Sequence, residues 1–143
     1  MTLDPWHVLT ANFGQVPKPY TAFATLLDMV LYFVVTFKVG LARTKYKVVA
    51  PSTDGPEQFL RIFRVQMNTL EQLALHLPLL WIAAYAMDDV FAALLGLIWV
   101  FGRALYAVRY YQKAGRRTKG FMIALFANLL LFIGAVAGTI ASF

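Results

Sequence analysis

A cluster of polar side chains interrupts a membrane-length stretch of this 143-residue chain. Four of its members recur at positions i, i+3, i+7 and i+10, and so share one face of a helix: Arg61, Arg64, Asn68 and Glu71. Gln66 points roughly the other way. Charges and amides inside a membrane are costly unless they pair with one another or with a ligand. The cluster is therefore the first candidate for a functional site.

A second polar group follows later in the chain, at Arg103, Tyr106 and Tyr110, again on one helical face. The simpler explanation is an ion pair between Arg103 and Glu71 that joins two helices, with the tyrosines at the membrane interface. However, arginine outnumbers glutamate in this region. Uncompensated positive charge in a low-dielectric environment favours an anionic ligand.

The residue types indicate which anion would bind. Arginine forks bind carboxylates, Asn68 and Gln66 can hydrogen-bond peptide groups, and Glu71 can accept from an ammonium group. A small peptide with two carboxylates and one amine would satisfy all of them. The chain has no cysteine, so any thiol must come with the substrate. His7 and His76 are too far apart to suggest a metal site, and we expect no metal cofactor.

The composition indicates that these residues belong to an integral membrane protein. Hydrophobic residues make up 60% of the chain and charged residues 14%, with a mean hydropathy of +0.64, against about 45–50% and about 25% in soluble domains. The net charge of +6 would suggest nucleic acid in a soluble protein. Here the positive net charge is better explained by basic loops beside a membrane, and no nucleic-acid partner is expected.

We predict an all-α, multi-pass four-helix bundle that forms a single domain over residues 1–143. A span needs about 20 apolar residues, and the expected spans are about 20–42, 57–87, 90–111 and 120–142. The segment before them is expected to lie at the surface. The very short link after the second helix implies antiparallel neighbours. Gly134 and Gly138 are spaced to allow close helix approach.

Loop charges predict the orientation of the bundle. The loops after the first and third helices carry most of the cations, and the turn between the second and third carries two aspartates. By the positive-inside rule, the basic loops face the cytoplasm and both termini lie on the opposite side. The arginine-rich positions then lie toward the cytoplasmic half.

Three stretches give the sequence a family resemblance. They are FRVQMNTLE from Phe63 to Glu71, GPEQFLR before it, and GRALYAVRYY from Gly102 to Tyr111 with Arg117 beyond. The Arg-x-Gln-x-Asn-x-x-Glu pattern and the tyrosine motif resemble the MAPEG family, the membrane-associated proteins in eicosanoid and glutathione metabolism. The resemblance implies a homotrimer that binds glutathione as cosubstrate between adjacent subunits near the cytosolic face.

The resemblance also implies residue roles. Glutathione contacts fall on Arg64, Asn68, Glu71, Tyr106 and Tyr110, with Arg43 and Gln66 on the neighbouring subunit's side and Arg103 in support. Arg117 falls where catalytic members place an arginine over the glutathione sulfur, and Arg116 is its adjacent rival. Gln72 departs from the tyrosine of leukotriene-forming members. The implied activity is that of a membrane glutathione transferase acting on lipophilic electrophiles from the bilayer, with lipid hydroperoxide reduction as a related activity.

Two other functions fit the same helices. One is a non-catalytic relative that binds a lipid or hands it to a partner enzyme. The other is a small proton-coupled exporter of cationic or amphipathic compounds, driven by an intramembrane carboxylate such as Asp28 or Glu71. For Asp28 we favour a packing role in which it pairs with a neighbour. The excess of arginine makes cation export the weaker alternative.

Overall fold

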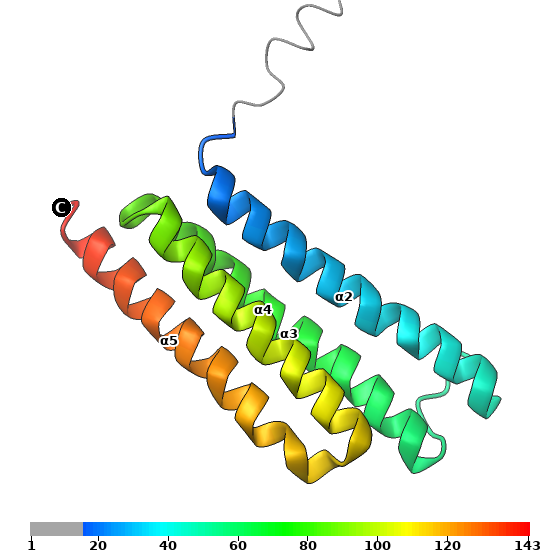
Figure 1. Ribbon diagram of the computed structural model, residues 1–143. Helices are drawn as coiled ribbons and strands as arrows, with labels where there is room; N and C mark the ends of the chain where they lie inside the picture. The colour runs from blue at the N-terminus through cyan, green and yellow to red at the C-terminus, as the bar shows by residue number, and fades with distance from the viewer. Residues whose placement is uncertain (1–15) are drawn as a thin grey trace, which may run out of the picture.

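A computed structural model of the chain describes residues 16–143, as four long helices that lie side by side (Figure 1). They are α2 (Pro19–Tyr46), α3 (Glu57–Ala86), α4 (Asp89–Gln112) and α5 (Thr118–Ile140), with a short 3-10 helix, η1 (Ala114–Arg117), before α5. The prediction of an all-α four-helix bundle is confirmed for these residues. The surface segment predicted at the N-terminus falls mainly on residues 1–15, outside the described residues.

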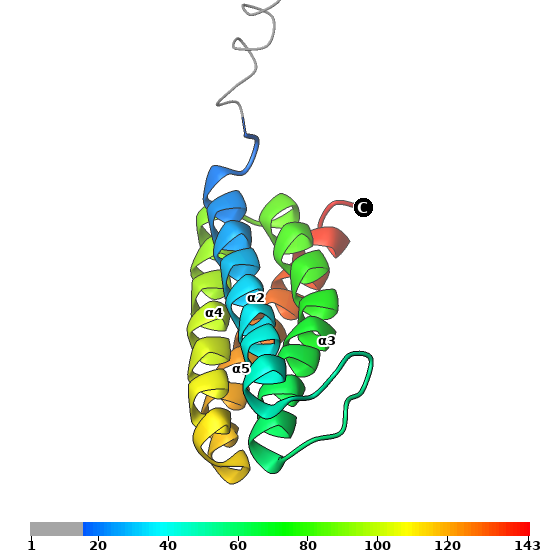
Figure 2. The ribbon, with the colours of Figure 1, turned by 90° about the vertical axis from the view of Figure 1, so that its right-hand side faces the viewer.

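Helices α3 and α4 lie between α2 and α5 (Figure 1). Only Met87 and Asp88 separate α3 from α4, so the two helices run antiparallel, as the short link predicted. The longer connection from α2 to α3, residues 47–56, projects at the other end of the bundle (Figure 2). Helices α2 and α3 therefore form one antiparallel pair, and α4 and α5 form the other.

Three segments of residues 16–143 combine the length and the hydropathy needed to cross a membrane: Pro19–Tyr46, Asp89–Gln112 and Ala114–Ile140. Helix α3 is also long enough, because its 30 residues extend about 45 Å. Its polar side chains, such as Arg64, Glu71 and His76, lower its mean hydropathy. The protein is thus an integral membrane bundle in which α3 carries the polar face.

Carboxylates at the start of α4 fix one end of the bundle. Asp88 caps α4 by accepting a hydrogen bond from the Phe91 amide at 2.9 Å. Asp89 accepts from the backbone amides of Tyr20 and Thr21, at 3.2 and 2.9 Å, and so satisfies free amides at the N-terminus of α2. Of the two acidic residues of the predicted turn, Asp88 therefore caps α4 and Asp89 holds α2 against α4.

Glycines allow the closest helix contacts. A Cβ added at Gly120 would lie 2.7 Å from the Gly102 carbonyl oxygen and closer still to the backbone nitrogen of Tyr106, so α4 and α5 meet backbone to backbone. A Cβ at Gly138 would collide with the backbone of Ala86, and one at Gly134 with the side chain of Met87. The predicted close approach at this pair is made against the end of α3.

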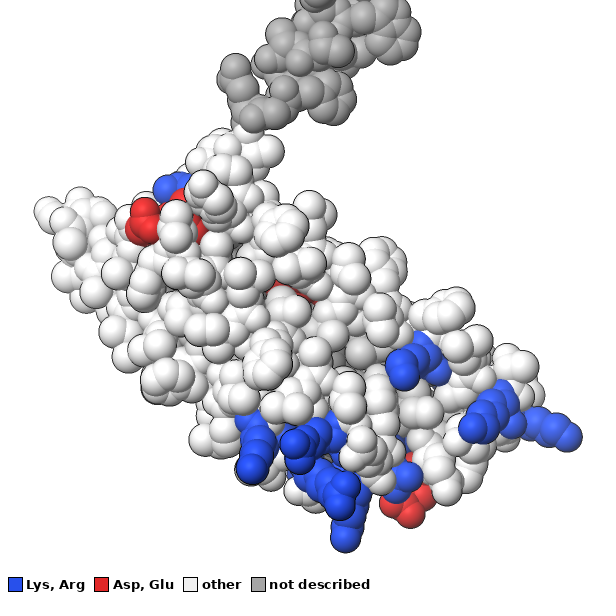
Figure 3. Space-filling view, viewed as in Figure 1, with Lys and Arg blue, Asp and Glu red and all other residues white. Residues whose placement is uncertain are grey.

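Charge is unevenly distributed along the bundle. Most visible Lys and Arg side chains gather at the end where α2 finishes and α4 leads into α5, with few acidic side chains among them, whereas acidic residues predominate at the opposite end (Figure 3). We call the first the basic end. It contains both of the loops from which the sequence predicted the orientation, and the assignment of that end to the cytoplasm stays a prediction.

Gly120→Ala should lower the free energy of unfolding by about 1–3 kcal/mol, because the new methyl group overpacks the α4–α5 contact. Thermal unfolding in detergent, followed by circular dichroism, measures the change. Gly40→Ala is the matched control, since Gly40 is also helical but has nothing within 4 Å of an added Cβ. Equal losses in the two variants would contradict the proposed backbone contact.

Candidate functional site

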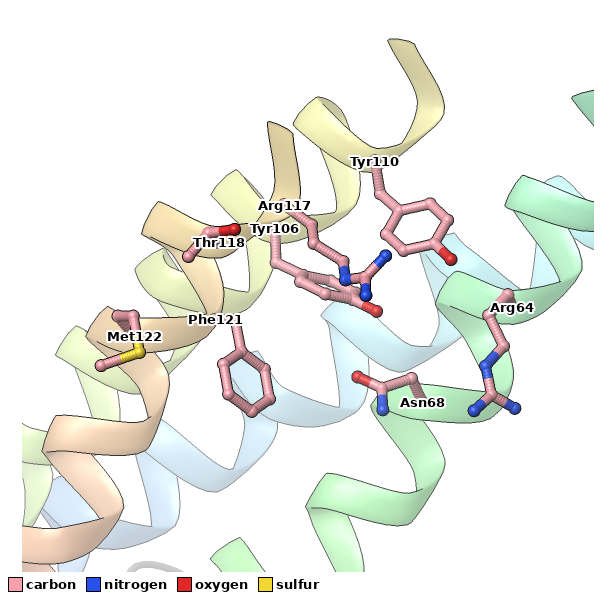
Figure 4. Close-up of a pocket in the computed structure, with 8 residues that line it drawn as sticks. All are labelled: Arg64, Asn68, Tyr106, Tyr110, Arg117, Thr118, Phe121 and Met122. Atoms are coloured by element: carbon pink, nitrogen blue, oxygen red, sulfur yellow. The ribbon is translucent and has the colours of Figure 1, made fainter. Parts of the chain in front are cut away.

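A pocket of about 440 Å³ opens at the basic end, between α3, α4 and the start of α5 (Figure 4). Its walls come from three parts of the chain that are distant in sequence. They are Arg64 and Asn68 of α3, Tyr106 and Tyr110 of α4, and Arg117, Thr118, Phe121 and Met122 around the start of α5. The structure thus brings two residues from each predicted polar cluster, and Arg117, to one cavity.

Arg103 lies behind this pocket and supports it. Its side chain is 1% exposed, and its guanidinium donates to Asn68 Oδ1 at 3.1 Å and to Thr69 Oγ1 at 2.9 Å. The same group lies 4.1 Å from the centre of the Tyr106 ring, a favourable cation–π contact. Arg103 therefore fixes the Asn68 amide, with its oxygen directed inward.

Glu71 does not form the ion pair with Arg103 that the sequence suggested. Its carboxylate lies 3.9 Å from the Arg64 guanidinium and accepts a hydrogen bond from Asn68 Nδ2 at 3.3 Å. The Arg64 and Glu71 side chains are 60% and 50% exposed, so water screens this pair and it contributes little to stability. Arg103 instead bonds the neutral acceptors of Asn68 and Thr69, and the Arg64–Glu71 pair stays at the solvent-exposed edge of the site.

Arg117 approaches the pocket from η1. Its guanidinium donates to the Ala114 carbonyl at 3.3 Å and lies 5.2 Å from the centre of the Tyr110 ring. Figure 4 shows the side chain extending past Tyr106 toward Tyr110. Its rival, Arg116, bonds Gln112 at 3.4 Å and is not part of the pocket wall. The geometry therefore favours Arg117 as the arginine that faces a bound molecule.

Two predicted site residues lie away from this pocket. Arg43 donates to the Ser52 carbonyl at 2.8 Å and lies against the rings of Phe59 and Phe63. Gln66 donates to the Tyr32 hydroxyl at 2.9 Å, on the face of α3 opposite Asn68. Within one described chain, neither residue contributes to the cavity. Their role on a neighbouring subunit stays a prediction.

Arg61 shares a helical face with Arg64, yet it pairs within its own helix. It donates to Glu57, one turn earlier, at 2.5 Å. The sequence reasoning gave Arg61 no ligand role.

Sequence reasoning missed four residues of the site. Thr69 accepts from Arg103, and Thr118, Phe121 and Met122 line the cavity. Nothing in their types marks them, since threonine and large apolar residues are common in spans. Only the position of the last three, directly after Arg117, could have suggested that they lie beside it.

Another polar cluster is buried deeper in the bundle, away from the pocket. His76 Nδ1 lies 2.7 Å from Asn128 Oδ1, and His76 Nε2 lies 3.4 Å from Asp28 Oδ2. The imidazole stacks on Trp99, with ring centres 4.0 Å apart. The prediction that Asp28 pairs with a neighbour is confirmed. Across residues 16–143 no group of three His, Asp or Glu side chains could hold a metal ion.

Comparisons with known proteins give consistent matches. A profile of the MAPEG family matches residues 21–137. A Synechocystis protein, sll1147, described as uncharacterized, is 47% identical over 117 residues, or 82% of this chain and 85% of that protein. Mouse microsomal glutathione S-transferase 2 is 39% identical over 107 residues, 75% and 73% of the two chains. Bovine leukotriene C4 synthase is 35% identical over 122 residues, 85% and 81% of the two chains.

Thr69→Val should destabilise the fold by about 1–3 kcal/mol, because it removes the acceptor of a buried guanidinium donor. Thermal unfolding in detergent measures the loss. Thr44→Val serves as the control, since the exposed Thr44 hydroxyl reaches only a carbonyl of its own helix, at 3.5 Å; it should change stability by less than about 0.5 kcal/mol. An unchanged Thr69→Val protein would show that Arg103 does not need this partner.

Proposed function

Because this chain belongs to the MAPEG family, we propose that it is a membrane glutathione transferase that activates the glutathione thiol for attack on lipophilic electrophiles. The family predicted from the sequence motifs is thereby confirmed. The observation that carries the proposal is the pocket where Arg64, Asn68 and Arg117 converge, next to membrane-spanning helices. The mouse relative is, by its name, a glutathione S-transferase.

Glutathione fits this pocket by size and by chemistry. A volume of about 440 Å³ falls within the usual range for small-molecule sites, roughly 300–1,000 Å³. The Arg64 fork suits a carboxylate. The Asn68 Nδ2 group can donate to a peptide carbonyl, since Arg103 already occupies its oxygen. Glu71 at the edge can accept from the ammonium group, and the two tyrosines supply hydroxyls and ring faces.

Arg117 would hold the sulfur as a thiolate. A free thiol with a pKa near 8.5 is only a few per cent ionised at pH 7, and a nearby guanidinium can lower the pKa to roughly 6.5. That change corresponds to about 2.7 kcal/mol of preferential thiolate stabilisation. A thiolate of lower pKa is also a weaker nucleophile, with a Brønsted slope of about 0.4–0.5. The net gain at pH 7 is therefore about threefold, before any gain from positioning the two reactants.

The electrophile would arrive along the α5 wall. Phe121 and Met122 give that side of the pocket an apolar surface, which suits a lipophilic molecule leaving the bilayer. In conjugation, the thiolate sulfur forms a bond to the electrophilic carbon and the leaving group departs with its electron pair. With a lipid hydroperoxide, the thiolate attacks the terminal peroxide oxygen, the O–O bond breaks, and the departing alkoxide takes a proton to become the alcohol. A second glutathione then condenses with the sulfenic acid to give glutathione disulfide and water.

We place the complete site between subunits of a homotrimer. Arg43 and Gln66 lie outside the pocket of their own chain, so they can serve glutathione only from a neighbouring copy. In that assembly the basic end faces the cytoplasm, where glutathione is dissolved. The trimer and this orientation are both part of the proposal.

The two other functions have less support. A non-catalytic lipid-binding relative would not need an arginine in the pocket wall, where Arg117 lies. An exporter driven by Asp28 would need a water path to that carboxylate, yet Asp28 is fully buried beside His76. Absence of both glutathione conjugation and thiolate absorbance in the purified protein would favour the lipid-binding alternative. Proton-dependent flux in liposomes would favour export.

Arg117→Ala should reduce glutathione conjugation at pH 7 by at least about threefold, through the lost thiolate stabilisation. Glutathione affinity should stay nearly unchanged, because the carboxylate and amide contacts remain. The apparent pKa of the bound thiol, followed by its thiolate absorbance in the ultraviolet, should rise from roughly 6.5 toward 8.5. The ratio of wild-type to variant turnover should then shrink as the pH is raised from 7 toward 9.

Arg116→Ala is the matched control for this prediction, since the neighbouring arginine lies outside the pocket wall. It should keep both the wild-type turnover and the wild-type thiol pKa. If Arg116→Ala and not Arg117→Ala loses activity, the assignment of the two arginines is reversed. If neither variant changes turnover, arginine activation of the thiol is wrong.

A mixed assembly tests whether the site is shared between subunits. Arg64→Ala and Arg43→Ala chains, expressed separately, should each lose most glutathione binding. Expressed together, they should regain part of it, because an intact Arg64 on one subunit then meets an intact Arg43 on its neighbour. Isothermal titration with glutathione on the co-purified protein measures the recovery. A complete loss in the mixture would show that each site is built from one chain.

A further inference from the structure

A second cavity lies at the basic end, on the α2 side of the bundle rather than the α5 side. Its volume is about 270 Å³, and no residue in its wall is shared with the candidate glutathione pocket. Its lining residues come from α2, α3 and α4: Lys38, Leu41, Ala42, Lys45, Tyr46, Ile62 and Tyr111. The chemistry of this set differs from that of the first pocket.

Two lysines supply the charge of this cavity. Lys38 and Lys45 are seven residues apart on α2, so they share a face and lie about 10 Å apart along the axis. No carboxylate lines the cavity, and neither lysine forms an ion pair with any residue of the described chain. Their ammonium groups contact aromatic rings instead: Lys38 Nζ lies 4.8 Å from the Tyr111 ring centre and Lys45 Nζ lies 5.4 Å from that of Tyr46. The cavity therefore carries uncompensated positive charge.

The residues beside the two lysines on α2 are apolar and exposed on the outside of the bundle. Val34 and Leu41, on the same face of α2, are 49% and 57% exposed, and α2 is one of the segments long and apolar enough to cross a membrane. Lys38 lies eight residues, or about 12 Å, before the end of this helix. A lysine at such a depth directs its ammonium toward the headgroup region while its stem packs on apolar surface. The cavity thus combines headgroup-level cations with a surface suited to acyl chains.

We propose that this cavity binds one acidic phospholipid, whose phosphate contacts Lys38 and Lys45 and whose acyl chains extend from the level of Leu41 along Val34 toward the middle of α2. Basic pockets between membrane helices are suited to anionic headgroups. A zwitterionic lipid fits less well, since its own cation would find no carboxylate in the cavity. A free anion would gain the charge contacts but would leave the apolar face of α2 unused. This inference is independent of the glutathione proposal.

Native mass spectrometry of protein extracted from vesicles tests the site. The vesicles contain phosphatidylcholine with a minor fraction of phosphatidylglycerol, and the retained lipids are counted for wild type and for Lys38→Gln/Lys45→Gln. Wild type should retain phosphatidylglycerol in preference to phosphatidylcholine. The ratio of retained phosphatidylglycerol to phosphatidylcholine should be roughly 25-fold lower in the double variant, since each lysine near an anionic headgroup contributes about a fivefold factor. Wild type that retains neither lipid in preference would overturn the proposal.

Lys113→Gln/Lys119→Gln is the matched control, because it removes two lysines from the same end of the bundle but from outside the cavity. It should keep the preference within about twofold, whereas an equal loss would mean that only overall charge matters. Lys38→Arg/Lys45→Arg should keep the preference, because the charge remains. Turnover with glutathione in pure phosphatidylcholine vesicles checks that each variant is folded. If the double variant does not fold, Lys45→Glu, at the exposed end of α2, should also lose the preference, and an unchanged preference would overturn the proposal.

Inorganic phosphate distinguishes a lipid from a free anion. Excess phosphate should not displace phosphatidylglycerol from wild type, because phosphate has no acyl chains and cannot replace their contacts with α2. Full displacement would show that the cavity is a site for soluble anions, and the lipid assignment would then be wrong.

Discussion

The burial of one guanidinium constrains the basic half of the bundle. Removing an arginine from water costs several kcal/mol unless its donors are satisfied, and the Arg103 side chain is almost completely buried. Its partners, Asn68 and Thr69, lie next to each other on α3, so the two hydrogen bonds hold α3 and α4 at one relative height. Any sliding of one helix past the other would leave the charge unpaired. This contact therefore sets the relative positions of the α3 and α4 walls of the candidate pocket.

Burial also separates the roles of the arginines. The two terminal nitrogens of Arg103 donate to neutral acceptors inside the protein, and Arg61 is paired with Glu57. Arg64 keeps most of its surface in solvent, and Arg117 extends into the cavity from a short 3-10 helix rather than from the core. Of these four arginines, only Arg64 and Arg117 can meet a mobile anion without losing a partner the fold needs. Residue type alone does not distinguish the groups, whereas exposure to solvent does.

The sequence predicted the helices well because apolar length and turn residues determine them locally. It also predicted that Arg64, Asn68 and Glu71 share a face, since helical periodicity fixes direction. It was wrong about the partner of Arg103, because periodicity does not fix which rotamer reaches which acceptor. Phe121 and Met122 were missed for a related reason: they join the pocket only through the packing of α5 on α4, which Gly102 and Gly120 allow. Whether Arg43 and Gln66 join a site depends on a second copy.

The buried cluster around His76 explains why the basic end can stay open. Its members come one from each helix: Asp28 from α2, His76 from α3, Trp99 from α4 and Asn128 from α5. This layer brings a buried side chain from each of the four helices into contact in the middle of the bundle. The Arg103 contacts, by comparison, join only α3 and α4. At that height α5 is held by backbone packing on α4, and among residues 16–143 no hydrogen bond or ion pair joins it to α3 there. The space left between α3 and α5 is the cavity lined by Arg64, Asn68 and Phe121, so a firmly held middle layer lets the bundle keep a pocket at its end.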